Sequence, residues 1–313
     1  MKVIAVFPQG LEREGANELA ELGATSLKVL LRSVSFEIDL RGYYRIHLKA
    51  RLPFRFLREI ASFPCHGEDS LYEGVQGACD WEKWLHPSQS FRVDVSGRNI
   101  GLPHSHFTAL KVKNALVDLQ RKTWGQRSSI NLDEPDFCIH LHLSHVNASL
   151  SFASTRGSLH RRGYRPAMGV APLKENIAAG LIRLSNWDSS IPLVDPLCGS
   201  GTFLIEAANI ALGLPSGLHR RFLFLSWPDF DCQLWESEKE AATQSFDILN
   251  KCPKIIGCEE NKDIAIQANQ NIRSAGLEDV INIQNVHFNQ LIFPQESGVV
   301  ICNPPYGKRL GNE

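Results

Sequence analysis

The chain has 313 residues, of which 43% are hydrophobic and 21% charged, and its formal net charge is −1. This composition is typical of a soluble globular protein with room for two domains or a little more, and any affinity for nucleic acid must come from local patches. The eight cysteines form no Cys-x-x-Cys pair, which argues against a disulfide framework and a zinc site and favours reduced thiols in the cytoplasm. No run reaches about 18 apolar residues, so we expect no membrane span.

The N-terminal part of the chain alternates short strand and helix patterns. Residues 3–7 are apolar and read as a buried strand, and residues 11–22 carry the apolar spacing of a helix. Residues 34–40 alternate as a strand does, and another helix is expected at about 43–51. The pattern predicts a small α+β region of ferredoxin-like kind over residues 1–64.

A second unit follows, with strands around one long helix. Residues 91–95 alternate cleanly, a helix is expected at about 107–122, and residues 137–143 and 146–153 read as strands. Cysteine and histidine side chains share one face of the third of these segments, where a metal site is conceivable. Because no further ligand pair has suitable spacing, we interpret them as polar strand positions and expect no metal.

The middle of this neutral chain is basic. Between Arg92 and Arg127 there are seven basic residues and two acids, and residues 156–165 hold four arginines and no acid. A charge run alone is more often a solvated helix face or a linker. The catalytic pattern downstream favours RNA instead, because neutralising phosphates supplies much of the affinity for nucleic acid. The candidate RNA-binding residues are Arg98, Lys111, Lys113, Arg121, Lys122, Arg161, Arg162 and Arg165.

The last part of the chain alternates helix and strand. Helix patterns occupy about 172–185, 202–212 and 262–275, and strand patterns occupy 191–194, 254–258, 281–286 and 299–302. Such alternation predicts an α/β domain with a parallel sheet. In open parallel sheets ligands bind outside the carboxyl ends of the strands, and Asp195, Glu259 and Asn303 all fall there.

A glycine turn joins the first of these strands to a helix, in the segment Asp195-Pro196-Leu197-Cys198-Gly199-Ser200-Gly201-Thr202. Glycines let the backbone approach a ligand, and the helix N-terminus offers free N–H groups to a carboxylate. Glu259, at the tip of the next strand, can accept hydrogen bonds from both ribose hydroxyls. The arrangement predicts a nucleoside cofactor site, although a Gly-Ser-Gly turn alone would be weak support.

The segment Asn303-Pro304-Pro305-Tyr306 follows the last predicted strand. The Asn303 side-chain oxygen and the Pro304 carbonyl can accept hydrogen bonds from an exocyclic NH2 group, and the prolines fix the backbone that presents them. Tyr306 can stack on a base that has been flipped out of a duplex. The alternative is a rigid Pro-Pro turn with no chemistry. Together with the glycine turn, the segment predicts methyl transfer to an amino group on a base.

The whole chain resembles bacterial RNA guanine-N2 methyltransferases with a THUMP domain, especially the 23S rRNA enzymes once labelled as adenine-specific DNA methylases. The resemblance implies a ferredoxin-like region at 1–64, a THUMP RNA-binding domain at 65–155, a basic linker at 156–171 and a Rossmann-like S-adenosylmethionine-dependent domain at 172–313. The segments that carry it are residues 159–165 (LHRRGYR), 171–175 (APLKE), 195–208, 227–230 (WPDF) and 303–311.

The resemblance also implies roles for single residues, with two departures. The family usually has an acid after the third strand that accepts from the adenine of the cofactor, whereas here the aligned residue is His287, or Asn289 if the loop shifts. The family fold continues through three more strands after the Asn-Pro-Pro-Tyr segment, so we expect a fragment or a domain truncated after its fourth strand. The implied cofactor residues are Asp195, Cys198, Gly199, Ser200, Gly201, Thr202, Glu259 and His287, and the implied base-binding residues are Asn303, Pro304, Pro305 and Tyr306.

Four functions are compatible with these observations. The first is guanine-N2 methylation of 23S rRNA in the cytoplasm, and the second is the same chemistry on tRNA. The third is adenine-N6 methylation of DNA, which also suits the Asn-Pro-Pro-Tyr segment but not a THUMP-like region. The fourth is an RNA-binding protein with no activity, because the catalytic domain is expected to be incomplete.

Overall fold

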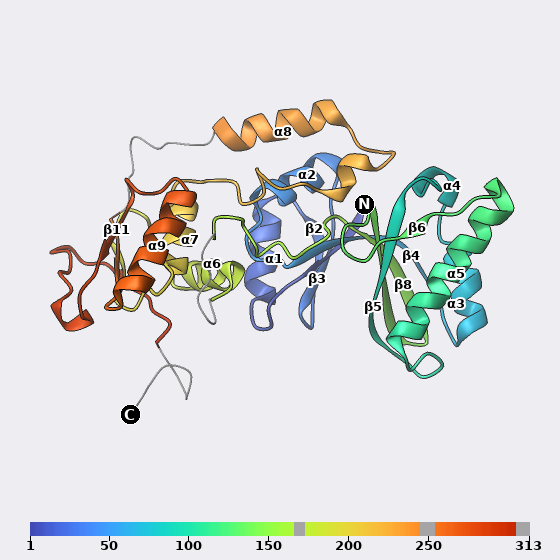
Figure 1. Ribbon diagram of the computed structural model, residues 1–313, viewed down its shortest axis with the longest axis horizontal. Helices are drawn as coiled ribbons and strands as arrows, with labels where there is room; N and C mark the ends of the chain where they lie inside the picture. Colours follow the sequence, from blue (N-terminus) through green and yellow to red (C-terminus); the bar gives the residue numbers. More distant parts are fainter. Residues whose placement is uncertain (166–172, 245–253, 305–313) are drawn as a thin grey trace.

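The computed structural model describes residues 1–165, 173–244 and 254–304, and it contains two sheets joined by one continuous chain (Figure 1). The larger sheet is built from the N-terminal half and the smaller one from the C-terminal half. In spatial order the strands of the larger sheet are β2 (Thr25–Leu30), β3 (Ser33–Glu37), β1 (Lys2–Val6), β4 (Arg55–Pro64), β8 (Asn147–Ala153), β7 (Phe137–His145), β5 (Ser90–Asn99) and β6 (Ser129–Ile130).

The long strand β4 joins the ferredoxin-like and THUMP-like regions into this single sheet. Leu57 of β4 is opposite Ile4 of β1 on one side and opposite Ala153 of β8 on the other, and both pairings are antiparallel. The pairings of β5 with β7 and β6 are parallel. We expected one region at 1–64 and a second at 65–155, and β4, which ends at Pro64, pairs with strands of both.

Helices cover the larger sheet and bury its apolar side chains. Val3 and Phe36 are buried in one core with Leu19 and Ile46 of the N-terminal helices, and Val112 of the long helix belongs to the same core. The helices are α1 (Glu12–Glu21), α2 (Leu40–Lys49), α3 (Glu68–Gln76), α4 (Trp81–Trp84) and α5 (Ser105–Trp124).

The smaller sheet has four parallel strands with helices packed around it, as an α/β domain requires. Its spatial order is β11-β10-β9-β12, and a hydrogen bond of 2.9 Å from Ile301 N to Val194 O extends the last pairing beyond β12. These elements are α6 (Glu175–Leu184), β9 (Leu193–Asp195), α7 (Thr202–Ala211), β10 (Ile255–Cys258), α9 (Lys262–Ser274), β11 (Ile281–Gln284), η2 (Phe288–Gln290) and β12 (Val299–Val300).

An insertion between α7 and β10 returns to the larger sheet. It contains η1 (Leu223–Ser226) and α8 (Cys232–Gln244), and α8 lies along α2 (Figure 1). Trp227 packs edge-on against Phe152 of β8, with ring centroids 5.8 Å apart, and Asp229 forms an ion pair of 2.6 Å with Arg58 of β4. The insertion therefore connects the C-terminal half of the chain to the sheet of the N-terminal half.

Most elements expected from periodicity are present within a few residues of their expected ends. One strand is shorter than expected: β3 ends at Glu37 because Asp39 caps α2, accepting a hydrogen bond of 2.7 Å from Gly42 N. Within the described residues, no group of three or more His, Cys, Asp and Glu side chains could hold a metal ion. None of the described helices is both long and apolar enough to cross a membrane.

Candidate active site

The carboxyl ends of the four parallel strands meet at one edge of the smaller sheet. Asp195 at the end of β9 is in register with Gly257 of β10, and Val194 is in register with Val300 of β12. Residues that directly follow these strands therefore emerge at the same edge, which brings Asp195, Glu259 and Asn303 to one side of the domain. This is the edge at which the sequence predicts the cofactor and the base.

The glycine turn after β9 is held from two neighbouring elements. Gly199 and Gly201 have φ values of +52° and +80°, a left-handed conformation that favours glycine. Cys198 N donates to Cys258 O at 2.9 Å, which ties the turn to β10. Asn271 of α9 donates through Nδ2 to Ser200 O at 3.1 Å. The turn is thus fixed without any side chain on its glycines, where a ligand can approach the backbone.

Helix α7 begins immediately after this turn and leaves its first N–H groups free of intrahelical partners. Its first internal hydrogen bond runs from Ile205 N to Gly201 O at 3.0 Å. The N-cap residue is Gly201, which has no side chain with which to cap the helix. No acidic residue lies in the first turn. The N-terminus of α7 can therefore bind an anionic group of a ligand, such as a carboxylate.

Two carboxyl groups lie beside the turn in different surroundings. Asp195 is 1% exposed, and burial raises its pKa to about 7, an effect that the Leu197 N–H opposes and the neighbouring Glu259 charge reinforces. Glu259 is half-buried and accepts a hydrogen bond of 2.9 Å from Asn261 N. Asn261 in turn caps α9 by accepting hydrogen bonds from the N–H groups of Asp263 and Ile264. The site therefore presents one deeply buried and one accessible acid.

Three further predicted residues lie on loops at this edge. His287 follows β11 and is exposed, and its Nε2 lies 3.8 Å from Glu260 Oε2. Asn303 and Pro304 follow β12 and are exposed. Pro305 and Tyr306 lie outside the described residues, so their roles stay predictions.

Two of the predicted RNA-binding arginines lie inside the protein instead of on its surface. The Arg162 side chain is 6% exposed, and its Nε lies 3.7 Å from Glu206 Oε1. The Arg165 side chain is 8% exposed, and its Nε lies 3.6 Å from Glu175 Oε1. Both guanidinium groups therefore face carboxylates in the interior, which differs from the expected RNA-facing position. Arg161, between them and Leu159, is exposed.

The other predicted RNA-binding residues belong to the larger sheet and its long helix. Arg98 is exposed near the end of β5, and Arg121 and Lys122 are exposed in the last turn of α5. Lys111 forms an ion pair with Glu68 and lies over the Phe107 ring, and Lys113 is half-buried on the same helix. Their contact with RNA stays a prediction.

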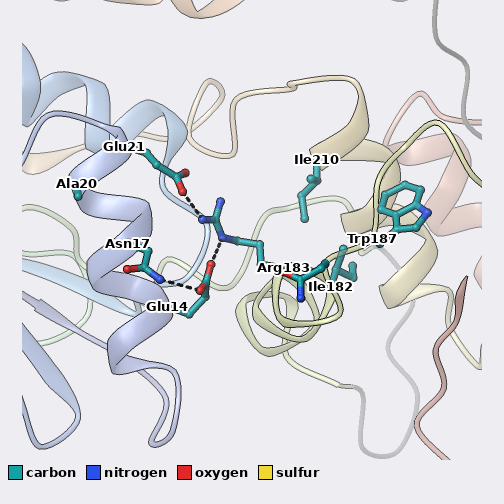
Figure 2. Close-up of a pocket in the computed structure, with 9 residues that line it drawn as sticks. Glu14, Asn17, Ala20, Glu21, Ile182, Arg183, Trp187 and Ile210 are labelled. Carbon is teal, nitrogen blue, oxygen red and sulfur yellow. Dashed lines mark hydrogen bonds and ion pairs between the residues drawn. The ribbon is translucent and has the colours of Figure 1, made fainter.

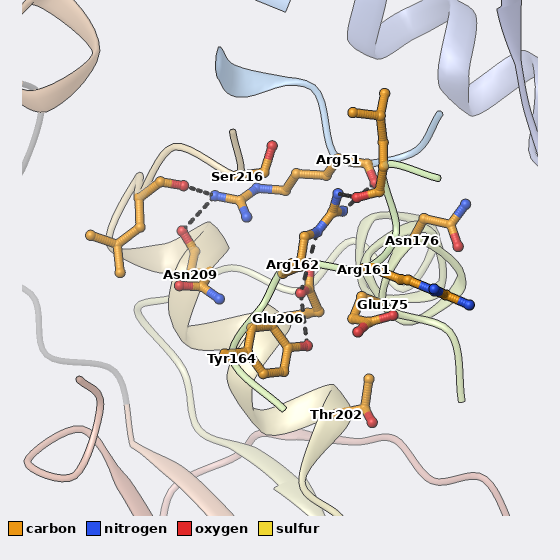
Figure 3. A network of polar contacts seen from close by, with 12 residues as sticks. Arg51, Arg161, Arg162, Tyr164, Glu175, Asn176, Thr202, Glu206, Asn209 and Ser216 are labelled. Carbon is orange, nitrogen blue, oxygen red and sulfur yellow. Dashed lines mark hydrogen bonds and ion pairs between the residues drawn. The ribbon is translucent and has the colours of Figure 1, made fainter. Parts of the chain in front are cut away.

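Residues that sequence reasoning missed surround helix α7 (Figure 3). Arg51 donates through Nη2 to Asn209 O at 2.8 Å and also to Leu214 O, at the C-terminal end of the helix. Tyr164 OH donates to Glu206 Oε1 at 3.0 Å. Glu206 is fully buried, and a single acid among the mostly apolar residues 203–211 was a signal that it has a partner. Arg51 gave no comparable signal.

A groove lies between α1 and α6, where the two halves of the chain meet (Figure 2). Arg183 of α6 reaches across it and forms ion pairs of 2.6 Å with Glu14 and 2.8 Å with Glu21, both on α1. Ile210, which also lines the groove, belongs to the end of α7 opposite the glycine turn. We therefore interpret this groove as part of the contact between the halves and not as a part of the cofactor site.

Comparison with known proteins places the whole chain in one family. Residues 2–57 match the RlmL ferredoxin-like domain, residues 65–153 match the THUMP domain, and residues 162–313 match the methyltransferase domain described as RMKL-like. The matches occur in the order expected from the sequence.

Relatives and solved structures agree with these matches. The chain is 41% identical to the putative RNA methyltransferase slr0064 of Synechocystis sp., over 99% of this chain and 80% of that protein. It is 38% identical to the ribosomal RNA large subunit methyltransferase K/L of Aliivibrio fischeri, over 100% of this chain but 45% of that protein. The crystal structure of SMU.472, a putative methyltransferase complexed with SAH, superposes with a TM-score of 0.88 at 31% identity, over 99% of this chain and 82% of that chain. The chain therefore belongs to the methyltransferase family that combines an RlmL ferredoxin-like domain, a THUMP domain and an RMKL-like methyltransferase domain.

Proposed function

We propose that this chain transfers a methyl group from S-adenosylmethionine to N2 of a guanine in RNA, and that the RNA is 23S rRNA. The observation that carries the proposal is the shared sheet edge, where the glycine turn, Asp195, Glu259 and Asn303 all emerge. Family membership supports RNA methylation, because the relatives reported above carry the names putative RNA methyltransferase and ribosomal RNA large subunit methyltransferase K/L. The guanine-N2 position and the choice of 23S rRNA rest on the resemblance of the sequence.

The residues of the site fit S-adenosylmethionine group by group. The free N–H groups at the start of α7 suit the methionine carboxylate, and Glu259 can accept from the ribose hydroxyls. The buried Asp195 adds negative potential, which suits a cofactor that carries an ammonium and a sulfonium group. The related SMU.472 structure was solved with SAH, the demethylated product of the same cofactor. When bound, the cofactor supplies the electrophilic methyl group.

The chain's own residues then have to present the amino group of the base. Asn303 and the Pro304 carbonyl follow β12, the strand next to β9, and both are exposed. Their oxygens can accept one hydrogen bond from each N–H of an exocyclic NH2 group, which leaves the nitrogen lone pair free to attack the methyl group. Because an amine loses its proton readily after methylation, water can take that proton and no protein base is needed.

We also propose that residues 65–155 act as the RNA-binding domain beside the ferredoxin-like region at 1–64, that residues 156–171 form a linker, and that residues 172–313 carry catalysis. The exposed basic side chains on β5 and α5 support an RNA surface on the THUMP half of the larger sheet. We infer a cytoplasmic location from the proposed ribosomal substrate.

The test is methyl transfer by the Asn303→Ala variant. Tritiated S-adenosylmethionine is supplied with transcribed 23S rRNA, tRNA or DNA, and modified nucleosides are identified by mass spectrometry. We expect N2-methylguanine in 23S rRNA and a loss of about 100-fold or more in its rate of formation for Asn303→Ala. The control is Asn282→Ala, an exposed position on β11. An unchanged rate in Asn303→Ala would contradict the proposed base site. Methylation of tRNA alone, or of DNA alone, would contradict the proposal that 23S rRNA is the substrate.

A further inference from the structure

Three arginines from outside helix α7 hold this helix along its length. Arg165 bonds its first residue, Thr202, and Arg162 faces Glu206 in its middle. Arg51 donates to carbonyl groups at its C-terminal end (Figure 3). The arginines are themselves connected, because Arg162 donates to Arg51 O. One of them, Arg165, acts next to the glycine turn.

The contacts of Arg165 fix its guanidinium group on several sides. Its Nη2 donates to Thr202 Oγ1 at 2.5 Å and to Leu173 O at 2.8 Å. Glu175 balances its charge from 3.6 Å, and the guanidinium carbon lies 5.9 Å from the centre of the Tyr164 ring. With both the arginine and Glu175 less than a tenth exposed, the group cannot turn outward to RNA without leaving a buried carboxylate unpaired.

The electrostatic position of Arg165 points to an anionic ligand group. The N-terminus of a helix already carries partial positive charge, so a cation beside it is unfavourable in the absence of an anion. Glu175 balances the arginine, but the N–H groups of the first turn of α7 still face the glycine turn without a side-chain cap. An anionic group bound at this turn would be stabilised both by the helix N-terminus and by Arg165.

We infer that Arg165 is a positioning residue for the cofactor, an inference that rests on the proposed function. It acts through the Thr202 hydroxyl, which it holds so that the first turn of α7 and the preceding Gly201 keep one conformation. Arg162 and Tyr164 support the same helix through Glu206. The linker that follows the THUMP domain thus carries side chains that serve cofactor binding, in place of the RNA contacts expected from their charge.

The test is calorimetric titration of S-adenosylmethionine into the full chain and three single variants. Arg165→Met removes all contacts of the guanidinium group, and Thr202→Val removes only the hydroxyl that accepts one of its hydrogen bonds. The control is Arg221→Met, the same substitution at an exposed arginine. We expect the Kd for the cofactor to rise about tenfold or more in each of the first two variants, the scale of a lost hydrogen bond to a charged group, and to be unchanged in the control.

Two further measurements separate positioning from general damage. The double variant of Arg165 and Thr202 should bind the cofactor about as weakly as either single variant, because both remove one shared contact. The affinity of Arg165→Met for transcribed 23S rRNA, measured by filter binding, should stay within about twofold of the unaltered chain. If Arg165→Met does not fold, Thr202→Val carries the test, since valine matches threonine in size.

The outcomes that overturn the inference differ from those that overturn the proposed function. Unchanged cofactor affinity in Arg165→Met, or in Thr202→Val where the former does not fold, removes the inference and leaves methyl transfer intact. Weaker RNA binding with unchanged cofactor binding returns Arg165 to the RNA surface. If the unaltered chain does not bind S-adenosylmethionine, the proposed function and the inference fall together.

Discussion

Asp195 is an ionisable side chain that lies almost wholly inside the protein, at the end of a strand. Burial holds its pKa at about 7, above the ordinary value near 3.8. An acid with a raised pKa stabilises the folded state while it is protonated. This contribution is fully present below pH 3.8 and is lost as the pH rises through about 7. Near neutral pH, ionisation of this buried carboxyl therefore lowers the stability of the folded chain.

We expect Asp195→Asn to stabilise the ligand-free chain at pH 8 by on the order of 2–4 kcal/mol, because the amide needs no deprotonation in a buried site. The gain should be almost gone at about pH 3, below the ordinary pKa near 3.8, where the carboxyl is mostly protonated in both the folded and the unfolded state. The same variant should lose most of its affinity for S-adenosylmethionine. Urea unfolding at both pH values and calorimetry measure these effects, and a variant that is less stable than the unaltered chain at pH 8 would contradict the argument.

Residues of the site were predictable from the sequence where they directly follow a strand of the parallel sheet. Asp195, Glu259 and Asn303 each follow a strand pattern, and parallel strands deliver such residues to one edge. Arg162 and Arg165 were not predictable in this way. Their partners lie on helices elsewhere in the sequence, and a run of arginines has the same appearance on a surface as in a network of buried ion pairs.

Among the elements, helix α8 joins the halves of the chain through one buried acid. Glu238 is 4% exposed on its side chain and forms ion pairs of 2.8 Å with Arg41 and 3.1 Å with Arg45, both on α2. The aromatic rings of Tyr44 and Trp235 pack 5.5 Å apart beside them. A contact of this kind resists both translation and rotation of α8 over α2.

We expect Glu238→Gln to lower the free energy of unfolding by about 1–2 kcal/mol, since a buried charged acceptor of two arginines is replaced by a neutral amide. Glu236→Gln on the same helix serves as the control. Its side chain is 53% exposed and pairs with Lys239 one turn away, so its loss should stay within about 0.5 kcal/mol. Denaturant unfolding measures the loss of free energy in both variants. Equal losses would show that the buried ion pairs of Glu238 contribute no more than an exposed pair.

Periodicity predicted the long elements and missed the connections between them. Helix α5 and strands β5 and β7 were expected near their observed places because their apolar residues repeat with a clear period. Residues 55–64 gave no such signal, because most of β4 is only half-buried. Its pairing with β1 and β8 depends on contacts distant in the sequence, which a local pattern does not record.

At the scale of the whole molecule, the first 153 residues form one sheet, and this has a measurable consequence. Strands β1, β4 and β8 share hydrogen bonds, so opening any one of them breaks the ladder of its neighbour. We expect native-state hydrogen exchange to give the three strands one common opening free energy, different from that of β9 and β10. Separate opening of β1 and β8 would show that the ferredoxin-like and THUMP regions unfold independently.

The insertion that returns to the larger sheet is synthesised long after the residues on which it packs. Tyr43 and Tyr44 leave the ribosome roughly 180 residues before Phe224, Trp227 and Trp235, whose rings pack against them. At about 5–20 residues per second, these tyrosines wait roughly 10 to 35 s for their partners. Throughout that interval the nascent N-terminal half displays the tyrosine surface that the rings of the insertion cover in the folded chain. We therefore expect chaperones that shield aromatic surface to bind the growing chain until the insertion has been synthesised.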